Sequence, residues 1–287
     1  MRTDPLRINE CPMLSKGTML LAFTGWMDGG DVSTGTVRTL ITNQLEVRKV
    51  AHIDPEGFYI YNFPGSMEVS ALFRPHIKIE DGVVRSYDLP TNTFFCDEQK
   101  DLVLFIGREP NLNWETFGDC IFRFATTSGV KRILFVGSFG GTVPHTREPR
   151  LYATVSDPDL LSGLKTYGVR PSDYEGPGSF TSYLMTQVGD QGFDMVSLVA
   201  EIPAYLQGTN PICIEAVTRR LAPILGLKAN LAELRGASDE WESKVSDTVN
   251  KDEELAEKIR ELEKQYDDDL VNSPIAEAWM NDEGKEE

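Results

Sequence analysis

The sequence lacks a long apolar run and has few cysteines and histidines. No segment reaches the roughly 18 consecutive apolar residues of a membrane-spanning helix, and the N-terminus is too charged for a secretory signal. The four cysteines form no CxxC pair, and the three histidines lie far from one another in the sequence. We therefore expect a cytoplasmic protein with reduced cysteines, no metal site and no cofactor.

Basic side chains are also scarce. The 287 residues include 28 Lys and Arg against 45 Asp and Glu, so the net charge is −17. Most of this charge follows Gly236, where 18 acidic and 6 basic residues give −12. Because nucleic acids and anionic membranes attract basic surfaces, the sequence predicts neither of them as a partner.

Short apolar runs alternate with longer helical patterns along most of the chain. Hydrophobic residues make up 40% of the sequence, which is enough for a buried core. We expect strands at Thr18–Phe23, Val47–Ile53, Leu102–Ile106, Arg132–Val136 and Asp194–Val199, and helices at Trp114–Thr127, Ser179–Val188 and Ile212–Leu225. Several of these strands are apolar on both faces, as parallel strands covered by helices are. The pattern predicts an open α/β sandwich over residues 1–235.

The stretch from about residue 54 to 96 interrupts this alternation. Three short apolar runs, Phe58–Tyr61, His76–Ile79 and Val83–Tyr87, are separated by prolines and glycines. This pattern predicts a β-rich excursion with a hairpin turn at Glu80–Gly82. We expect the excursion either to cover a sheet edge or to supply an oligomer contact.

Residues 236–287 form a separate, acidic segment. Eight positions recur in alternating steps of four and three: Trp241, Val245, Thr248, Asp252, Leu255, Ile259, Leu262 and Tyr266. This heptad spacing predicts an acidic helical extension, followed by a mobile tail after Asp269. Two interpretations remain open, because the helix either packs on its own chain or is contributed to a partner subunit as an interaction helix.

Polar clusters follow the expected strands, at the sheet edge where α/β proteins bind ligands. The candidate binding residues are Asp28 after the first strand, Glu109 after the third, Gly140, Gly141, His145 and Arg147 after the fourth, and Glu201 after the fifth. We expect Asp28, Glu109, Arg147 and Glu201 to line one crevice.

Each cluster has a structural and a chemical interpretation. The two glycines either form a turn or let backbone N–H groups hold an anion. Glu109 and Glu201 either work as an acid–base pair or cap helices and form ion pairs with Arg108 and Arg147. His145 either holds its loop by hydrogen bonds or contacts a ligand. The sequence contains no GxGxxG, P-loop, GxSxG or HExxH motif, so we assign no catalytic residue.

The same segments resemble the prokaryotic branch of the proteasome assembly chaperone family. The resemblance rests on the order of Leu20–Asp31 (LLAFTGWMDGGD), Gly107–Pro110 (GREP), Gly137–Arg147 (GSFGGTVPHTR), Tyr174–Phe180 (YEGPGSF) and Ser197–Tyr205 (SLVAEIPAY). It covers residues 20–227, and the acidic segment resembles the helical extension of longer bacterial members. The resemblance implies a three-layer α/β/α sandwich with a mostly parallel sheet, similar in shape to phosphorylases and hydrolases, that forms homo-oligomers.

Two departures limit what this resemblance implies. Archaeal relatives engage proteasome subunits through a C-terminal hydrophobic–Tyr–any tail, whereas this sequence ends in Asp282–Glu287 (DEGKEE). Actinobacterial relatives often have a histidine in a Pro-His-Tyr loop where this sequence has Ala204. Neither that proteasome contact nor a role for that imidazole is therefore expected here.

Two functional hypotheses follow. In the first, the protein is a non-enzymatic, assembly-chaperone-like homo-oligomer whose partners are itself and another protein complex. In the alternative, it is a phosphorylase- or hydrolase-like enzyme, or a binder of a nucleoside- or anion-type ligand, that uses the crevice. There the two glycines and Arg147 would hold an anion, and Glu109 or Glu201 would contact a nucleoside-like group or move a proton. An ATP-dependent ligase is a weaker third hypothesis, because the sequence offers no recognisable phosphate-binding and magnesium-binding residues.

Overall fold

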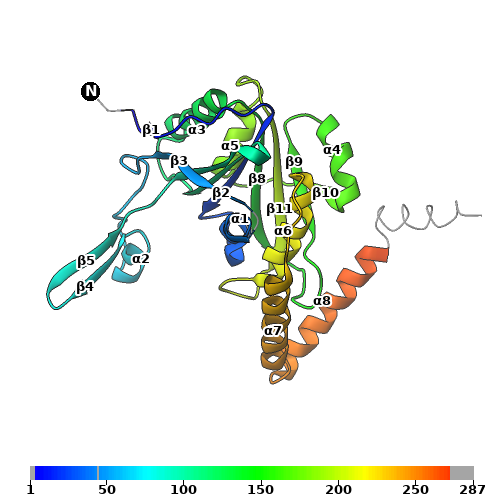
Figure 1. The fold of residues 1–287 in the computed structure, drawn as a ribbon. Coiled ribbons are helices and arrows are strands. Elements are labelled where there is room, and N and C mark those ends of the chain that lie inside the picture. The colour runs from blue at the N-terminus through cyan, green and yellow to red at the C-terminus, as the bar shows by residue number, and fades with distance from the viewer. Residues whose placement is uncertain (1–3, 44, 272–287) are drawn as a thin grey trace, which may run out of the picture. The chain divides into compact units, whose positions relative to one another are not determined.

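The computed structural model describes residues 4–43 and 45–271 of the chain (Figure 1). The chain divides into two compact units, each built from separate parts of the sequence. Unit 1 comprises Met1–Trp26, Leu45–Phe135 and Glu175–Met195, and unit 2 comprises Met27–Gln44, Val136–Tyr174 and Val196–Glu287. One nine-stranded sheet supplies strands to both units, in the order β1-β3-β6-β7-β2-β8-β11-β9-β10.

Unit 1 contains most of the strands. Its elements are β1 (Leu6–Ile8), β2 (Gly17–Thr24), β3 (Arg48–Ile53), α2 (Met67–Ala71), β4 (His76–Glu80), β5 (Val83–Asp88), β6 (Thr93–Asp97), the short 3-10 helix Glu98–Lys100, β7 (Leu102–Arg108), α3 (Trp114–Ser128), the first half of β8 (Val130–Gly141) and α5 (Phe180–Gln187). At the centre, Leu20 of β2 pairs in parallel with Leu104 of β7 and Leu134 of β8. Towards the edge, β6 is antiparallel to β7, β3 to β6 and β1 to β3.

Unit 2 contains the remaining strands and the long C-terminal helices. Its elements are the 3-10 turn Gly29–Asp31, α1 (Val32–Asn43), the second half of β8, β9 (Leu151–Val155), α4 (Asp159–Leu164), the 3-10 turn Lys165–Tyr167, β10 (Val169–Pro171), most of β11 (Asp194–Pro203), α6 (Pro211–Ile224), α7 (Ala232–Val249) and α8 (Glu253–Val271). β11 is antiparallel to β9, which is parallel to β10. Figure 1 shows α7 and α8 meeting at a sharp turn.

The predicted α/β sandwich with a helical C-terminal extension is confirmed. All five expected strands and all three expected helices are present. The sheet is parallel at its centre and mixed towards its edges. The short connection between β6 and β7 explains part of this mixture, because a tight link suits antiparallel neighbours whereas parallel ones need a long crossover.

The excursion contains the expected hairpin, since β4 and β5 pair with each other in a two-stranded sheet of their own. Phe58–Tyr61, the first of the three apolar runs, does not form a strand. Phe58 and Tyr59 are buried in an irregular segment, where the Tyr59 hydroxyl contacts Asn92 Oδ1 at 2.7 Å. The apolar pattern of this run thus reflects the burial of its side chains and not strand pairing.

The eight positions at heptad spacing lie on two helices that a turn separates, rather than on one continuous helix. α7 ends at Val249, and Asp252 starts α8 by accepting the backbone N–H of Leu255 at 3.1 Å. An aspartate is a favoured N-cap residue, so this polar seam position begins a new helix. The expected boundary at Gly236 falls inside α7, and the expected mobile tail lies largely at 272–287, outside the described residues.

Neither membrane spans nor disulfides are found in the described part of the chain. No helix within residues 4–43 and 45–271 is long and apolar enough to cross a bilayer. All four cysteines are free, and three of them are buried.

An aromatic cluster forms the centre of unit 1. One face of α3 is apolar and buried, because Phe117, Ile121 and Phe124 are fully buried. The ring centroid of Phe117 lies 4.9 Å from that of Phe58 and 5.4 Å from that of Phe180. Phe117 therefore joins α3 to α5 and to the irregular segment before the hairpin.

Replacing Phe117 by alanine should lower the free energy of unfolding by about 3–5 kcal/mol, because it leaves a cavity among fixed aromatic rings. The control is Phe139→Ala, where the side chain is 37% exposed and the loss should stay below about 1.5 kcal/mol. Urea denaturation of both variants measures the difference. Equal losses would contradict the central role of Phe117.

Candidate functional site

The candidate residues lie in both units. Glu109 belongs to unit 1, and the other predicted binding residues belong to unit 2. Each is described below with the groups that it contacts in its own unit.

Glu109 follows β7 directly and holds two backbone segments. One carboxylate oxygen accepts the N–H of Phe180 at 2.8 Å, and the other accepts the N–H of Trp26 at 3.2 Å. Phe180 is the first residue of α5, whose N-terminal N–H groups have no partner within the helix. Glu109 therefore joins the start of α5 to the turn after β2.

Glu201 lies near the end of β11 and is buried. Its Oε1 accepts the N–H groups of Thr142 at 2.7 Å and of Val143 at 3.1 Å, and the Thr142 hydroxyl lies 3.3 Å away. Its Oε2 lies 3.2 Å from the guanidinium of Arg150, and the two side chains are only 6% and 8% exposed. The carboxylate of Glu201 thus fills an anion-binding cradle made of backbone, hydroxyl and guanidinium donors.

The glycine pair explains how the carboxylate reaches this position. A Cβ at Gly141 would overlap the side chain of Glu201, and a Cβ at Gly140 would lie 3.3 Å from the Cβ of Ala204. Gly141 is therefore required by the close approach of Glu201. The N–H groups after the glycines hold an anion, and in this structure the anion is the protein's own carboxylate.

Asp28 holds the first turn of α1. Its two oxygens accept the backbone N–H of Thr34 at 3.0 Å and the Thr34 hydroxyl at 2.9 Å. Burial raises the pKa of Asp28 to about 6, and the nearby charge of Asp31 acts in the same direction, while the bonds from Thr34 oppose the rise. Asp28 therefore changes its protonation state close to neutral pH.

His145 is buried and engaged at both ring nitrogens. The Tyr205 hydroxyl accepts the backbone N–H of His145 at 2.8 Å and forms a second hydrogen bond, also of 2.8 Å, with Nδ1. Nε2 forms a hydrogen bond of 3.1 Å with the Ser246 hydroxyl of α7. Burial lowers the pKa of His145, although the charge of Glu263 opposes this shift. The imidazole is neutral and links its loop to α7.

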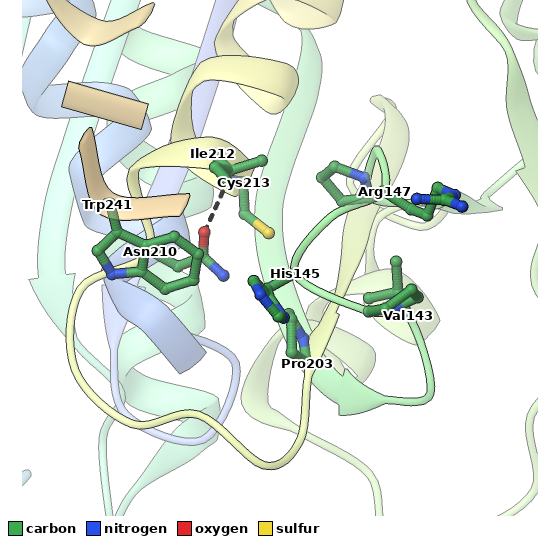
Figure 2. Close-up of a pocket in the computed structure, with 10 residues that line it drawn as sticks. Val143, His145, Arg147, Pro203, Asn210, Ile212, Cys213 and Trp241 are labelled. Carbon is green, nitrogen blue, oxygen red and sulfur yellow. Dashed lines mark hydrogen bonds between the residues drawn. The ribbon is translucent and has the colours of Figure 1, made fainter. Parts of the chain in front are cut away.

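A small pocket of about 170 Å³ adjoins His145 (Figure 2). Its lining includes Pro203, Asn210, Cys213 and Trp241. Burial raises the pKa of the Cys213 thiol, which disfavours the thiolate needed for nucleophilic attack. These 170 Å³ include open solvent, so the pocket offers no enclosed space for a nucleoside-sized ligand.

Arg147 points away from Trp241 and binds the C-terminal helix (Figure 2). Its Nε and Nη2 each lie 2.9 Å from one carboxylate oxygen of Asp267. The neighbouring Thr146 hydroxyl donates to Glu263 of α8 at 2.5 Å. Arg147 is therefore occupied by a carboxylate of the protein itself.

Arg150 binds both Glu201 and α8. Its guanidinium lies 4.3 Å from the ring centroid of Tyr266 and 3.1 Å from Asp269. The Tyr266 hydroxyl donates to the backbone carbonyl of Glu148 at 2.8 Å. Among the other residues of the predicted interaction helix, Ile259 is buried, while Trp241, Val245, Leu255 and Leu262 are partly exposed.

The candidate carboxylates are thus used by the fold. Glu109 and Glu201 bind backbone N–H groups at different places, and the cation beside Glu201 is Arg150 rather than Arg147. In the part of the chain that the structure describes, no group of three or more His, Cys, Asp or Glu side chains is arranged to hold a metal ion. The arrangement binds internal backbone and side-chain groups and leaves no free acid–base pair beside the pocket.

Sequence reasoning missed three residues of this network: Arg150, Tyr205 and Ser246. Arg150 lies three residues after the segment GSFGGTVPHTR, and Tyr205 is the last residue of the segment SLVAEIPAY. Their proximity to the strand ends is a weak signal. Ser246 has no sequence signal, because only the packing of α7 brings it to His145.

The sequence of the chain matches the PAC2 family model over residues 22–249. The chain belongs to the PAC2 family. The resemblance to proteasome assembly chaperones is therefore confirmed. The comparison with curated proteins gave no match.

Solved structures of PAC2 proteins are similar along most of the chain. A PAC2 family protein from Streptomyces avermitilis is 28% identical, with 85% of this chain and 99% of that chain covered and a TM-score of 0.70. A proteasome-assembly chaperone homologue from Mycobacterium tuberculosis is 27% identical, with 84% and 99% covered and a TM-score of 0.72. An M. tuberculosis protein of unknown function is 23% identical, with 96% and 95% covered and a TM-score of 0.80, which shows the fold alone.

Asp28→Asn should gain stability relative to the native chain as the pH rises from 4 to 7. The pKa of Asp28 is higher in the folded chain than its ordinary value, so the folded state binds the proton more tightly. The native carboxyl thus favours folding at low pH and loses that contribution as the pH rises to about 6. Asparagine is an equally good cap and does not titrate.

The matched control for this pH profile is Asp101→Asn. The Ser15 hydroxyl and N–H lower the pKa of Asp101, so here the native chain should gain relative stability as the pH rises. Urea denaturation from about pH 2.5 to 8 tests both variants, because the contribution of Asp101 changes at and below its ordinary pKa of 3.8. Two profiles of the same sign would contradict the assigned environments.

Glu201→Gln should lower the free energy of unfolding by about 3 kcal/mol, because it leaves the buried Arg150 facing an amide N–H₂ group. The control Glu109→Gln removes a carboxylate that binds two N–H groups and should cost about 1 kcal/mol. Thermal and urea denaturation measure both losses. A Glu201→Gln protein as stable as the control would refute the cradle.

Proposed function

We propose that this PAC2 protein is a non-enzymatic, cytoplasmic interaction protein that acts as an assembly-chaperone-like homo-oligomer. The observation that carries the proposal is an exposed apolar surface on the β4–β5 hairpin. Support also comes from the relative whose printed description is a proteasome-assembly chaperone homologue. The strand-end carboxylates, which bind the protein's own donors, give the enzymatic alternative little support.

The hairpin has one apolar and one polar face. Cross-strand partners share a face, and the register pairs Ile77 with Tyr87 and Ile79 with Val84. These four side chains are 44–58% exposed. The opposite face carries charged side chains, including Lys78, whose amine lies 2.7 Å from Glu80.

Large apolar side chains are also exposed next to the hairpin in the sequence. Met67 of α2 is 82% exposed, and Leu72, directly after α2, is 76% exposed. Scattered apolar residues are common on protein surfaces, whereas a cluster of this kind marks a protein contact. Residues 63–89 thus supply most of the strongly exposed apolar side chains of unit 1.

An isolated two-stranded hairpin is only marginally stable in water. β4 and β5 pair with no strand of the nine-stranded sheet. Covering the apolar face would therefore both stabilise the hairpin and remove apolar area from water. Burial against another protein chain provides this cover.

The occupant that we propose for this face is the hairpin of a second copy. Two identical apolar faces can pack against each other about a two-fold axis, which is the commonest arrangement in homo-oligomers. Their polar faces would then stay in water. A client protein complex would be bound by the assembled form.

Ile77→Ser combined with Ile79→Ser should weaken self-association of the full chain by about 10⁴-fold, because the two-fold contact loses four isoleucines and each contributes about 1.5 kcal/mol. Both side chains are exposed in the single chain, so the variant should keep its circular dichroism and, in protein dilute enough to be monomeric, its thermal midpoint. Sedimentation over a range of concentrations measures the association.

The matched control is His76→Ser with Lys78→Ser, on the same strand but on the polar face. Its association constant should stay within about threefold of the native value, because exposed charges contribute little. A native chain that is monomeric at high concentration would refute the proposal. Equal weakening by both double variants would refute the assignment of the apolar face.

A further inference from the structure

Three side chains of the loop after β8 form a surface that binds an acidic helix. We call Thr146, Arg147 and Arg150 the arginine face. It contacts α8 through Glu263, Asp267, Asp269 and the ring of Tyr266. The two-pronged contact between Arg147 and Asp267 is directional as well as electrostatic, because a guanidinium matches the geometry of a carboxylate.

The contacts of α8 follow one stripe of the helix. Glu263, Tyr266 and Asp267 are separated by three or four positions, which puts them on one side. The arginine face thus recognises acidic and aromatic groups at helical spacing. Any chain that carries the same helix offers the same groups, so a second copy of this protein fits the face equally well.

The turn between α7 and α8 consists of Asn250, Lys251 and Asp252. Asn250 already has nearly helical dihedral angles, with φ −66° and ψ −13°. The heptad spacing continues across this turn without a change of phase, from Val245 on α7 to Leu255 and Ile259 on α8. The backbone change that separates the bent pair from one continuous helix is therefore confined to the last two residues of this turn, Lys251 and Asp252.

Straightening this turn would move α8 away from its own arginine face. His145 contacts Ser246 of α7, so the loop that carries the face lies beside the part of α7 that precedes the turn. In a continuous helix, Asp267 would lie about 22 Å beyond Asp252 along the axis of α7. The bent form therefore binds α8 within the chain, and the straight form leaves the face open.

We propose that α8 is an exchangeable interaction helix, and that the arginine face of one copy binds the α8 of a second copy. The exchange keeps every contact of the bent form but makes it between chains, which is the low-cost route to association known as domain swapping. The inference rests on the proposed homo-oligomer and adds a second contact to it, independent of the hairpin.

Crosslinking of the full chain tests the exchange. Cys11, the exposed native cysteine, is first replaced by serine. One chain carries Thr146→Cys, and a second chain, with a distinguishable mass tag, carries Glu263→Cys. The two chains are co-expressed, purified and treated with a short bismaleimide, and the product that joins them is measured on a denaturing gel.

Two further substitutions separate the bent from the straight form. Glu253→Pro occupies the first position of α8, where proline is well accepted, but it breaks a continuous helix. It should reduce the product between chains at least about tenfold. Asp252→Ala removes the cap of the bent form and should increase that product several-fold.

Two control pairs of cysteines distinguish the exchange from random collision and from the contact within one chain. Glu263→Cys paired with Ser162→Cys, an exposed residue of α4, reports random collision. A chain that carries both Thr146→Cys and Glu263→Cys reports the contact within one chain. A product between chains that exceeds the Ser162 control and falls with Glu253→Pro supports the exchange.

The opposite result overturns the exchange. In that result, crosslinking occurs only within the chain that carries both Thr146→Cys and Glu263→Cys. Alternatively, Glu263→Cys gives as much product between chains with Ser162→Cys as with Thr146→Cys. The mass of the uncrosslinked protein then decides separately about the proposed function. An oligomer without exchange leaves the hairpin proposal standing, and a monomer refutes both.

Discussion

The buried contact between Glu201 and Arg150 is the interaction on which the organisation of unit 2 depends. It brings a carboxylate from the end of β11 into the cradle after β8 and thereby fixes the loop of residues 142–150. That loop carries His145, which binds α7, and Arg147, which binds α8. The C-terminal helices are therefore held by a chain of contacts that begins at one charged pair.

This arrangement changes the meaning of the polar residues at the strand ends. In many α/β proteins, donors at this edge receive a ligand, whereas here they receive carboxylates of the protein itself. The backbone N–H groups that could bind a ligand anion instead bind Glu201 and Glu109. The apolar face of the β4–β5 hairpin is exposed instead, and it supports our proposal of a protein contact.

The regular elements could be predicted because their signals are local. The apolar runs around Leu20 and Leu104 and the spacing of Phe117 and Phe124 depend only on neighbouring residues. The hairpin turn at Glu80–Gly82 was equally clear. Phe58–Tyr61 forms no strand, because buried aromatic side chains in an irregular segment produce the same apolar pattern as a strand.

The site was harder to predict because its geometry is non-local. The residue types at Glu201, Gly141 and His145 were identified as candidates, but their partners come from distant parts of the chain. Arg150 and Ser246 have no spacing that marks them as those partners. The polar seam position Asp252 was visible in the sequence, yet its effect as a helix cap depends on the contacts that draw α8 back towards the loop.

We propose that another chain covers the apolar face of the hairpin. Hydrogen exchange of the full chain, followed over a range of protein concentrations, tests this claim most directly. We expect the backbone amides that pair β4 with β5 to exchange rapidly in dilute protein, and their protection to rise in step with the fraction of oligomer. Hairpin amides whose exchange is the same in dilute and concentrated protein, while the mass reports an oligomer, would contradict it.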